Sequence, residues 1–337
     1  MITRNNVYQK QAVLLLRKDA VKHNVTTIRS HTSATIIAVI KDNGYGTGLY
    51  NEYSILRECA VDFFAVINAE EARQLRSFGF TGSILVLAPV WALPDACDLL
   101  AMDAIFMLGS SEQASLLREA GAKLHRTPRV HLKIDTGLGR YGFHYRHIEK
   151  IASCLNSLSV EGCYTHFAAL APKPKKQLAL QKERFDNALL SLRLLGIDPG
   201  MTHMAASTAF LLGGDLGYDA IRPGSLLLGR SAVGTALPLD DAIAFQTHIT
   251  QTRLYPAGST LGYRAKRLRR DTRVGLLPVG TGDGVFLSSE LSPWPVLGSG
   301  TDFTLLDLTD TLLAAGDSIS LRVNPLFIHP AAAKRLI

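Results

Sequence analysis

The sequence predicts an α/β protein: a (β/α)8 barrel of the TIM type, followed by a smaller, mostly β C-terminal domain. Two observations lead to this prediction. Short apolar runs alternate with amphipathic stretches over about the first two-thirds of the chain. Near residues 228–233 the pattern changes to repeated β-type runs with few long helical stretches. We therefore expect the barrel at 11–230 and the β-rich domain at 231–337, with residues 1–10 packed against the latter. A doubly wound open sheet is the alternative for the first part.

The expected strands of the barrel are short and mostly rich in Val, Ile and Phe, as buried parallel strands are. They are Ala34–Ile40, Phe63–Ile67, Ser83–Leu87, Ala104–Leu108, Arg129–Ile134, Val160–Thr165, Met201–Met204 and Ala220–Arg222. The helix-like stretches are Ala12–Ser30, Ala69–Phe78, Ser111–Ala120, His147–Leu155 and Gln177–Leu195. Gly79, Gly121 and Gly196 follow three of these stretches and suit helix C-caps. In the second domain the expected strands are Ala244–Ile249, Val274–Val279, Phe303–Leu308 and Ile319–Val323.

The composition limits the class of protein. With 337 residues, 47% apolar and 19% charged, the chain is globular rather than disordered. It contains no apolar run of the roughly 18–20 residues that a membrane span needs, and residues 1–10 lack the apolar core of a signal peptide. The four cysteines show no CxxC spacing. We therefore expect a cytoplasmic enzyme with free thiols, no metal site and no membrane partner.

The net charge is +7, and much of it lies in a basic segment at residues 264–273. No helix-turn-helix and no pattern of stacking aromatic residues accompanies this charge. We interpret the basic segment as a solvated loop and strand edge, and we expect no nucleic-acid partner. A basic balance also attracts anionic ligands such as phosphate esters and carboxylates.

Lys41 directly follows the apolar run Ala34–Ile40 and precedes a glycine-rich turn, Asp-Asn-Gly-Tyr-Gly. A lysine at the end of a buried strand is costly unless it has a partner or a function. One interpretation is a Schiff-base lysine, whose amine must be partly desolvated to be nucleophilic. The other is a structural lysine held by an ion pair.

Other polar residues also stand at the ends of expected strands, where barrel enzymes place their sites. Arg140, in a segment with Lys133, suits a carboxylate ligand or a surface turn. His166 suits a catalyst or, more commonly, a core or supporting group. Ser207 offers a hydroxyl to a phosphate, or caps a helix. Together with Arg222 and its Pro-Gly turn, these residues indicate one cleft for a phosphorylated, carboxylate-handling cofactor chemistry.

These segments, in this order, resemble the alanine racemase family, which is a family of two-domain enzymes dependent on pyridoxal 5'-phosphate. The similarity lies in AVIKDNGYG at 38–46, HLKIDTGLGRYGF at 131–143, YTHFA at 164–168, AAST at 205–208 and IRPGSLLLG at 221–229. It continues in GSTLGYRA at 258–265, LPVGTGDG at 277–284 and TDFTLLDLTD at 301–310.

The resemblance implies a role for each matching residue. Lys41 would hold the cofactor and act as one acid/base, and Tyr263 would be the second base on the opposite face of the substrate. Arg222 would face the pyridine nitrogen, and a chain of His166 and Arg222 would support Tyr263. The cofactor phosphate would contact Tyr45, Ser207, Gly224 and Ser225. Arg140 would hold the substrate carboxylate, and Lys133 would be a carbamylated lysine beside it.

The family also places residues matching Tyr263 and Asp302 in the active site of the other subunit, which implies a homodimer. This chain departs from the family's pattern at four places. Gly280–Gly284 lacks the family's tyrosine, Thr301-Asp302 replaces a Met-Asp pair beside the substrate, Ala206 replaces an asparagine, and no tyrosine follows Tyr263. These changes affect phosphate binding and the choice of substrate.

The expected function is therefore the racemisation of a small amino acid, with alanine first and serine as a similar candidate. A different reaction on the same fold, such as decarboxylation, aldol cleavage or elimination, is one alternative. The absence of cysteine after Cys163 argues against the decarboxylases. A non-catalytic protein that binds pyridoxal phosphate is the other alternative, and the second domain argues against it.

Overall fold

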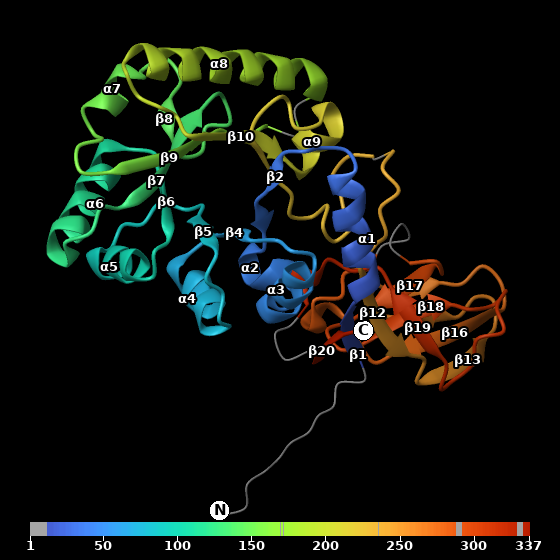
Figure 1. Ribbon diagram of the computed structural model, residues 1–337. Coiled ribbons are helices and arrows are strands. Elements are labelled where there is room, and N and C mark those ends of the chain that lie inside the picture. The colour runs from blue at the N-terminus through green and yellow to red at the C-terminus, as the bar shows by residue number, and fades with distance from the viewer. Residues whose placement is uncertain (1–11, 169, 171, 235, 288–291, 329–332) are drawn as a thin grey trace, which may run out of the picture. The chain divides into compact units, whose positions relative to one another are not determined.

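The computed structural model describes residues 12–168, 170, 172–234, 236–287, 292–328 and 333–337 (Figure 1). The chain folds into two compact units. Among the described residues, the barrel unit comprises Asp19–Gly44 and Glu52–Asp240, and the strand-rich unit comprises 12–18, Tyr45–Asn51 and 241–337. No helix among the described residues is both long enough and apolar enough to span a membrane.

The barrel unit is built on a ring of parallel strands. In hydrogen-bonded order these are β2 (Thr35–Ile36), β11 (Ala220–Arg222), β10 (Met201–Ala206), β9 (Ser159–Tyr164), β7 (Arg129–Asp135), β6 (Ile105–Leu108), β5 (Ser83–Val86), β4 (Phe63–Val66) and β3 (Ala38–Val39). The first and last of these are separated in the chain only by Ile37, whose N–H donates to the carbonyl of Ile221 at 2.9 Å. Counted as one interrupted strand, they close a ring of eight positions within the described part of the chain. The predicted eight-stranded barrel is confirmed.

Helices separate the strands of this ring. They are α1 (Lys18–Arg29), α2 (Lys41–Tyr45), α3 (Leu49–Glu58), α4 (Ala69–Ser77), α5 (Leu93–Ala101), α6 (Ser111–Leu124), α7 (Glu149–Ala152), α8 (Pro174–Leu194) and α9 (Ser207–Gly213). In Figure 1, α4 to α8 lie outside the strands of the barrel unit. A further short strand, β8 (Phe143–His144), pairs with β7 off the ring. All four residues of β6 are buried, as expected for a strand covered on both faces.

Two of the three predicted helix ends are confirmed. Gly79 and Gly196 follow α4 and α8 by two residues, and both have left-handed φ angles, of 85° and 75°. The prediction for Gly121 is wrong, because α6 continues to Leu124. His125, with φ of 51°, takes the left-handed C-cap instead. Gly121 serves close packing, since a Cβ there would lie 2.8 Å from the carbonyl oxygen of Arg126.

The strand-rich unit contains antiparallel sheets. One four-stranded sheet has the order β19 (Ser318–Leu321), β12 (Ile243–His248), β1 (Ala12–Leu16) and β20 (Ala333–Leu336), in which only β1 and β20 are parallel. The other has the order β13 (Gln251–Tyr255), β16 (Thr272–Leu277), β18 (Thr304–Asp307) and β17 (Val296–Ser299). A two-stranded sheet, β14 (Thr260–Leu261) with β15 (Lys266–Arg267), and two 3-10 turns, η1 (Thr281–Asp283) and η2 (Pro325–Phe327), complete it. The predicted mostly β second part is confirmed.

The predicted helix Ala12–Ser30 is wrong in its first part. Ala12–Leu16 forms β1, and α1 begins only at Lys18. Side chains of β1 alternate between buried and half-buried, which is the period of a strand. Its pairing with β12, Leu14 opposite Phe245, satisfies its backbone groups. Residues 1–10, expected to pack with the second domain, lie outside the described residues, and the boundary expected after residue 230 stays a prediction.

Candidate active site

Lys41 and the segment after β11 lie at neighbouring strand ends of the barrel. The N–H of Val39, the last residue of β3, donates to the carbonyl of Pro223 at 2.9 Å. Lys41 is two residues beyond Val39, and Gly224 is one residue beyond Pro223. Because both strands run in the same direction, Lys41 and Gly224 emerge together at the carboxyl-terminal face, which carries the sites of barrel enzymes.

The turn that carries Lys41 has an unusual backbone. Asp42, Asn43 and Gly44 have φ angles of 56°, 56° and 61° with ψ near 50°, which is left-handed helical conformation. The carbonyl of Ile40 accepts a hydrogen bond from the N–H of Gly44 at 3.2 Å. For residues with a side chain this conformation costs roughly 1–2 kcal/mol each, so neighbouring groups must hold it. Sequence analysis predicted a turn here but not its handedness.

The side chain of Lys41 is paired and partly open. Its Nζ lies 2.5 Å from Oδ2 of Asp42, and its side chain is 34% exposed. An ion-pair partner therefore exists, and the choice between the two interpretations of Lys41 stays a prediction. The pair is with the adjacent residue on the same turn, and the side chain stays partly exposed.

Ser207 contacts the backbone that follows β11. Its Oγ accepts hydrogen bonds from the N–H groups of Gly224 at 3.1 Å and Leu226 at 3.4 Å. The alternative that Ser207 caps a helix is wrong, because the N-cap of α9 is Ala206, which makes no side-chain cap. The hydroxyl hydrogen of Ser207 is thus placed to donate to a ligand beside this backbone.

Arg222 lies inside the barrel and is 2% exposed. One terminal nitrogen donates to Nδ1 of His203 at 2.6 Å, and the other donates to the carbonyl of Thr165 at 2.7 Å. Burial lowers the pKa of Arg222 to about 10, so it remains protonated at neutral pH. Sequence reasoning did not identify His203. Its signal is an ionisable residue inside the mostly apolar strand β10.

His203 continues a chain of buried histidines. Its Nε2 lies 2.8 Å from Nδ1 of His131, and its ring stacks on that of Tyr164 with centroids 4.8 Å apart. Burial, together with the charge of Arg222, lowers the pKa of His131 to about 3 and that of His203 well below its ordinary value. Gly162 makes room for this chain, because a Cβ there would lie 2.5 Å from the ring of His131.

His166 stands among the charged residues of the site. Burial lowers its pKa well below the ordinary value, and the charges of Arg222, Arg140, Lys133 and Lys41 lower it further, in that order. The structure therefore brings these four cations within electrostatic range of one imidazole. A hydrogen-bonded chain from His166 to Arg222 stays a prediction, since the histidine bonded to Arg222 here is His203.

Lys133 and Arg140 come from β7 and the loop after it. Lys133 is buried, and its Nζ donates to the carbonyl of Ile134 at 3.1 Å. Burial, followed by the charge of Arg222, lowers the pKa of Lys133 to about 7. Arg140 is exposed. Sequence reasoning did not assign a role to Asp135. Its Oδ1 accepts hydrogen bonds from the N–H groups of residues 137, 138 and 139, which shape the loop before Arg140.

The remaining predicted residues lie in the strand-rich unit. Tyr263, between β14 and β15, is 82% exposed, and its ring centroid lies 5.8 Å from that of Phe303. Thr301 and Asp302, which immediately precede Phe303, are exposed. The structure thus brings Tyr263 beside this loop. Tyr45 also belongs to this unit.

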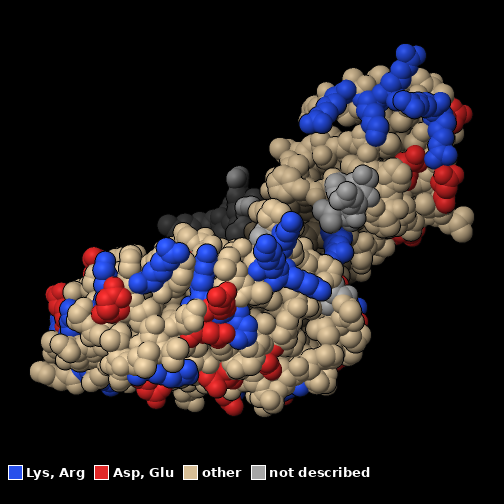
Figure 2. All heavy atoms as spheres, turned by 90° about the horizontal axis from the view of Figure 1, so that it is seen from above, with Lys and Arg blue, Asp and Glu red and all other residues tan. Residues whose placement is uncertain are grey.

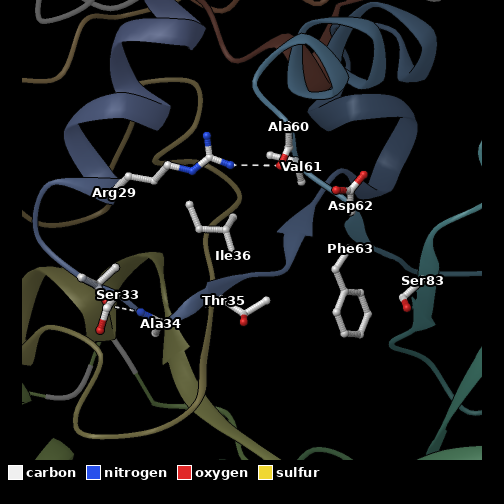
Figure 3. Close-up of a pocket in the computed structure, with 11 residues that line it drawn as sticks. Arg29, Ser33, Ala34, Thr35, Ile36, Ala60, Val61, Asp62, Phe63 and Ser83 are labelled. Carbon is white, nitrogen blue, oxygen red and sulfur yellow. Dashed lines mark hydrogen bonds between the residues drawn. The ribbon is translucent and has the colours of Figure 1, made fainter.

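A cavity of about 640 Å³ lies at the opposite end of the barrel strands (Figure 3). Thr35, Phe63 and Ser83, which line it, are the first residues of β2, β4 and β5. Arg29 crosses it and donates to the carbonyl of Ala60 at 3.1 Å. None of the predicted site residues lines this cavity, and the amino-terminal face of a barrel ordinarily serves stability.

Charged side chains are interspersed over the visible face of the barrel unit, whereas Lys and Arg gather at one end of the strand-rich unit (Figure 2). Lys266 and Arg267 form the exposed strand β15. Arg270 is paired with Asp310 at 3.0 Å and Asp307 at 3.4 Å. These contacts support the interpretation of the basic segment as a solvated strand edge.

Comparison with known proteins agrees with this arrangement. A family model described as alanine racemase, N-terminal domain, matches residues 16–232. The chain is 32% identical over 281 residues to alanine racemase 2 of Caldanaerobacter subterraneus subsp. tengcongensis, covering 79% of this chain and 71% of that protein. It is 31% identical over 332 residues to the alanine racemase of Salinispora arenicola, covering 91% and 87%.

Solved structures show the same fold. The alanine racemase from D-cycloserine-producing Streptomyces lavendulae has a TM-score of 0.86 at 23% identity, over 97% of both chains. The histidine racemase of Leuconostoc mesenteroides subsp. sake has a TM-score of 0.82 at 20% identity, over 97% of this chain and 98% of that one.

A barrel with a lysine, arginines and a histidine at its carboxyl-terminal face, followed by a strand-rich part, is the architecture of an amino-acid racemase, which is an isomerase. The relatives and the family model place it more narrowly. The chain belongs to the alanine racemase family.

Proposed function

We propose that this chain interconverts L- and D-alanine with pyridoxal 5'-phosphate as its cofactor, using Lys41 and Tyr263 as two bases. The observation that carries the proposal is the position of Lys41. Its turn emerges beside the Pro223–Ser225 backbone, and its charge acts on His166 together with those of Arg222, Arg140 and Lys133. Family membership supports the same assignment.

The residues present suit this cofactor. Lys41 offers a primary amine to its aldehyde. The Ser207 hydroxyl, which accepts the N–H of Gly224, would donate to its phosphate beside the backbone at Gly224 and Ser225. When bound, pyridoxal phosphate accepts the electron pair left at Cα after a proton departs. Arg222 would lie at its ring nitrogen. A guanidinium with a pKa of about 10 stays protonated near neutral pH, so it donates a hydrogen bond there without giving up its proton.

Racemisation needs a proton removed from one face of Cα and another delivered to the opposite face. Lys41 Nζ would hold the proton on one face, and Tyr263 Oη would hold it on the other. The tyrosine ionises near pH 10 in water, so neighbouring positive charge must help it act near neutral pH. Arg222 would supply that charge, and the neutral ring of His166 would connect Arg222 to Tyr263.

Arg140 would bind the substrate carboxylate through its guanidinium. Lys133 would hold Arg140 in place as a carbamate, which forms when the neutral amine of Lys133 adds carbon dioxide and releases a proton. Its pKa of about 7 leaves a large neutral fraction at physiological pH. The resulting negative charge would face Arg140 and Arg222, the cations that now lower the pKa of Lys133.

Tyr263 would act in the active site of a second copy of the chain, with Asp302 beside it, so the enzyme would be a homodimer. Its proposed location is the cytoplasm. The 82% exposure of Tyr263 supports the proposed homodimer, because a side chain used by a partner subunit is open on its own chain. Thr301 would form part of the wall next to the substrate side chain and favour a small one.

The first test is exchange of the Cα proton in heavy water. Purified protein with added pyridoxal phosphate is incubated with L- and D-amino acids, and NMR and chiral chromatography follow exchange and chirality. Alanine should exchange from both enantiomers and lose its chirality. Exchange that preserves chirality would contradict the two-base mechanism. Tyr263→Phe should bind the cofactor normally but lose interconversion at least a hundredfold.

A further inference from the structure

Glu71 holds the turn that carries Lys41. Its Oε1 accepts a hydrogen bond from the N–H of Asn43 at 2.9 Å, and its Oε2 accepts one from the N–H of Ile67 at 2.9 Å. Glu71 is buried, and its own N–H donates to Oδ1 of Asn68, the N-cap of α4, at 2.9 Å. The Glu71 carboxylate therefore links the turn after β3 to the loop after β4 through hydrogen bonds.

This turn needs such a tie. Asp42 and Asn43 are in the left-handed region, which residues with a side chain avoid. The neighbouring strands are already fixed, because the N–H of Ile40 donates to the carbonyl of Ala65 at 3.0 Å. The contact of Glu71 with Asn43 extends that fixed frame past the end of β3. This contact fixes the peptide groups that follow Lys41 in the chain, while β3 fixes those that precede it.

We propose that Glu71 is a positioning residue that directs the Lys41 amine toward the cofactor aldehyde. The proposal rests on the proposed role of Lys41. Glu71 acts through the backbone of Asn43 and does not itself touch the reacting atoms.

The chemistry favours a carboxylate over an amide. Two N–H groups point at the Glu71 side chain, and an ionised carboxylate accepts from both. Glutamine has one acceptor oxygen, so its NH2 group must face one of the two N–H donors. Glu71→Gln therefore keeps the size of the side chain but releases either the turn or the loop.

Gln113 provides a matched control. It occupies the same place at the start of α6, with its N–H donating to Oγ of Ser110 at 3.2 Å. Its Oε1 accepts from the N–H of Gly109 at 3.0 Å, and its Nε2 donates to the carbonyl of Met107 at 2.6 Å. It is also buried and also ties a helix start to a strand end, but β6 carries none of the predicted site residues.

The experiment compares Glu71→Gln, Glu71→Asp and Gln113→Ala with the unaltered full-length protein. Pyridoxal phosphate is added to cofactor-free protein and then borohydride, which reduces a C=N bond to a stable amine. Mass spectrometry of the peptides locates the attachment and gives its rate. Glu71→Gln should slow attachment to Lys41 at least tenfold, Glu71→Asp should recover part of the rate, and Gln113→Ala should stay within about twofold.

Amide hydrogen exchange of the cofactor-free proteins provides a second readout that does not depend on activity. In Glu71→Gln, the peptide spanning residues 41–46 should exchange at least tenfold faster, with no such change in Gln113→Ala. Equal exchange and equal attachment rates in both variants would overturn the positioning role. If unaltered protein attaches the cofactor at another lysine, the proposed function fails, and the role of Glu71 fails with it.

Discussion

Glu52 makes the stability of this chain depend on pH. It lies in α3 with no solvent exposure, and in the described part of the structure neither carboxyl oxygen has a hydrogen-bond partner. Burial raises its pKa to about 8 from an ordinary value of 4.5. Between those values the folded chain holds a proton that the unfolded chain releases, so the free energy of unfolding falls as pH rises.

The size of this effect follows from the shift. Each pH unit between the two pKa values lowers the free energy of unfolding by about 1.4 kcal/mol, and the slope is smaller close to either pKa value. Between pH 5 and pH 7 the protein should lose about 2.5 kcal/mol through Glu52 alone. Glu52→Gln cannot ionise, so it should lack this component while keeping the remaining pH dependence of the protein.

Urea unfolding followed by circular dichroism at both pH values measures this difference. The stability of Glu52→Gln relative to the unaltered protein should rise by about 2–3 kcal/mol from pH 5 to pH 7. Glu58→Gln is the control, because Glu58 lies on the same helix but is exposed and pairs with Lys22. Parallel pH profiles for the unaltered protein and Glu52→Gln would refute the reasoning.

Three further predictions concern the site and its supports. Gly162→Ala should destabilise the barrel by about 2 kcal/mol or more because its Cβ would meet His131, whereas Gly234→Ala, at an open position, should be near neutral in urea unfolding. Ser207→Ala should weaken pyridoxal phosphate binding at least tenfold in a spectroscopic titration, and unchanged affinity would remove Ser207 from the phosphate site. Carbon-13 NMR with labelled bicarbonate should show a carbamate at Lys133 that increases as pH rises through about 7, and a signal independent of pH would contradict the lowered pKa.

The barrel could be predicted because the local composition of the sequence indicates its strands. Runs such as Ile105–Leu108 are short and apolar throughout, which is typical of a strand covered on both faces. The missed helices α3 and α5 are less clear locally. The apolar spacing of α5 is interrupted by Pro94, which suits the first turn of a helix but also suits a loop.

Ala12–Leu16 shows a limit of periodicity. Five apolar residues in a row fit either a helix or a strand. Its partners β12 and β20 lie more than two hundred residues further along the chain, so only tertiary pairing decides the outcome.

The positions of the site residues followed from their places at strand ends, but their contacts did not. The left-handed turn after Lys41 depends on Glu71, which stands 30 residues further along the chain. The Asn68-x-x-Glu71 spacing predicts a capped helix start and gives no indication that the carboxylate also reaches another strand end. Likewise, the pairing of Arg222 with His203 is fixed by the neighbouring register of β10 and β11.

The hydrogen bonds that link Arg222, His203 and His131 have a fixed direction from donor to acceptor. An arginine N–H can only donate, so Nδ1 of His203 accepts, and in the neutral ring its Nε2 must carry the hydrogen. That hydrogen then points at Nδ1 of His131, which leaves Nε2 of His131 as the protonated nitrogen. Each imidazole is thereby restricted to one tautomer, and both ring dipoles turn their negative ends toward the guanidinium. The oriented neutral ring of His203 and the carbonyl groups of Thr165, His203 and Met204 thus surround the guanidinium of Arg222 with acceptors, none of which is a carboxylate.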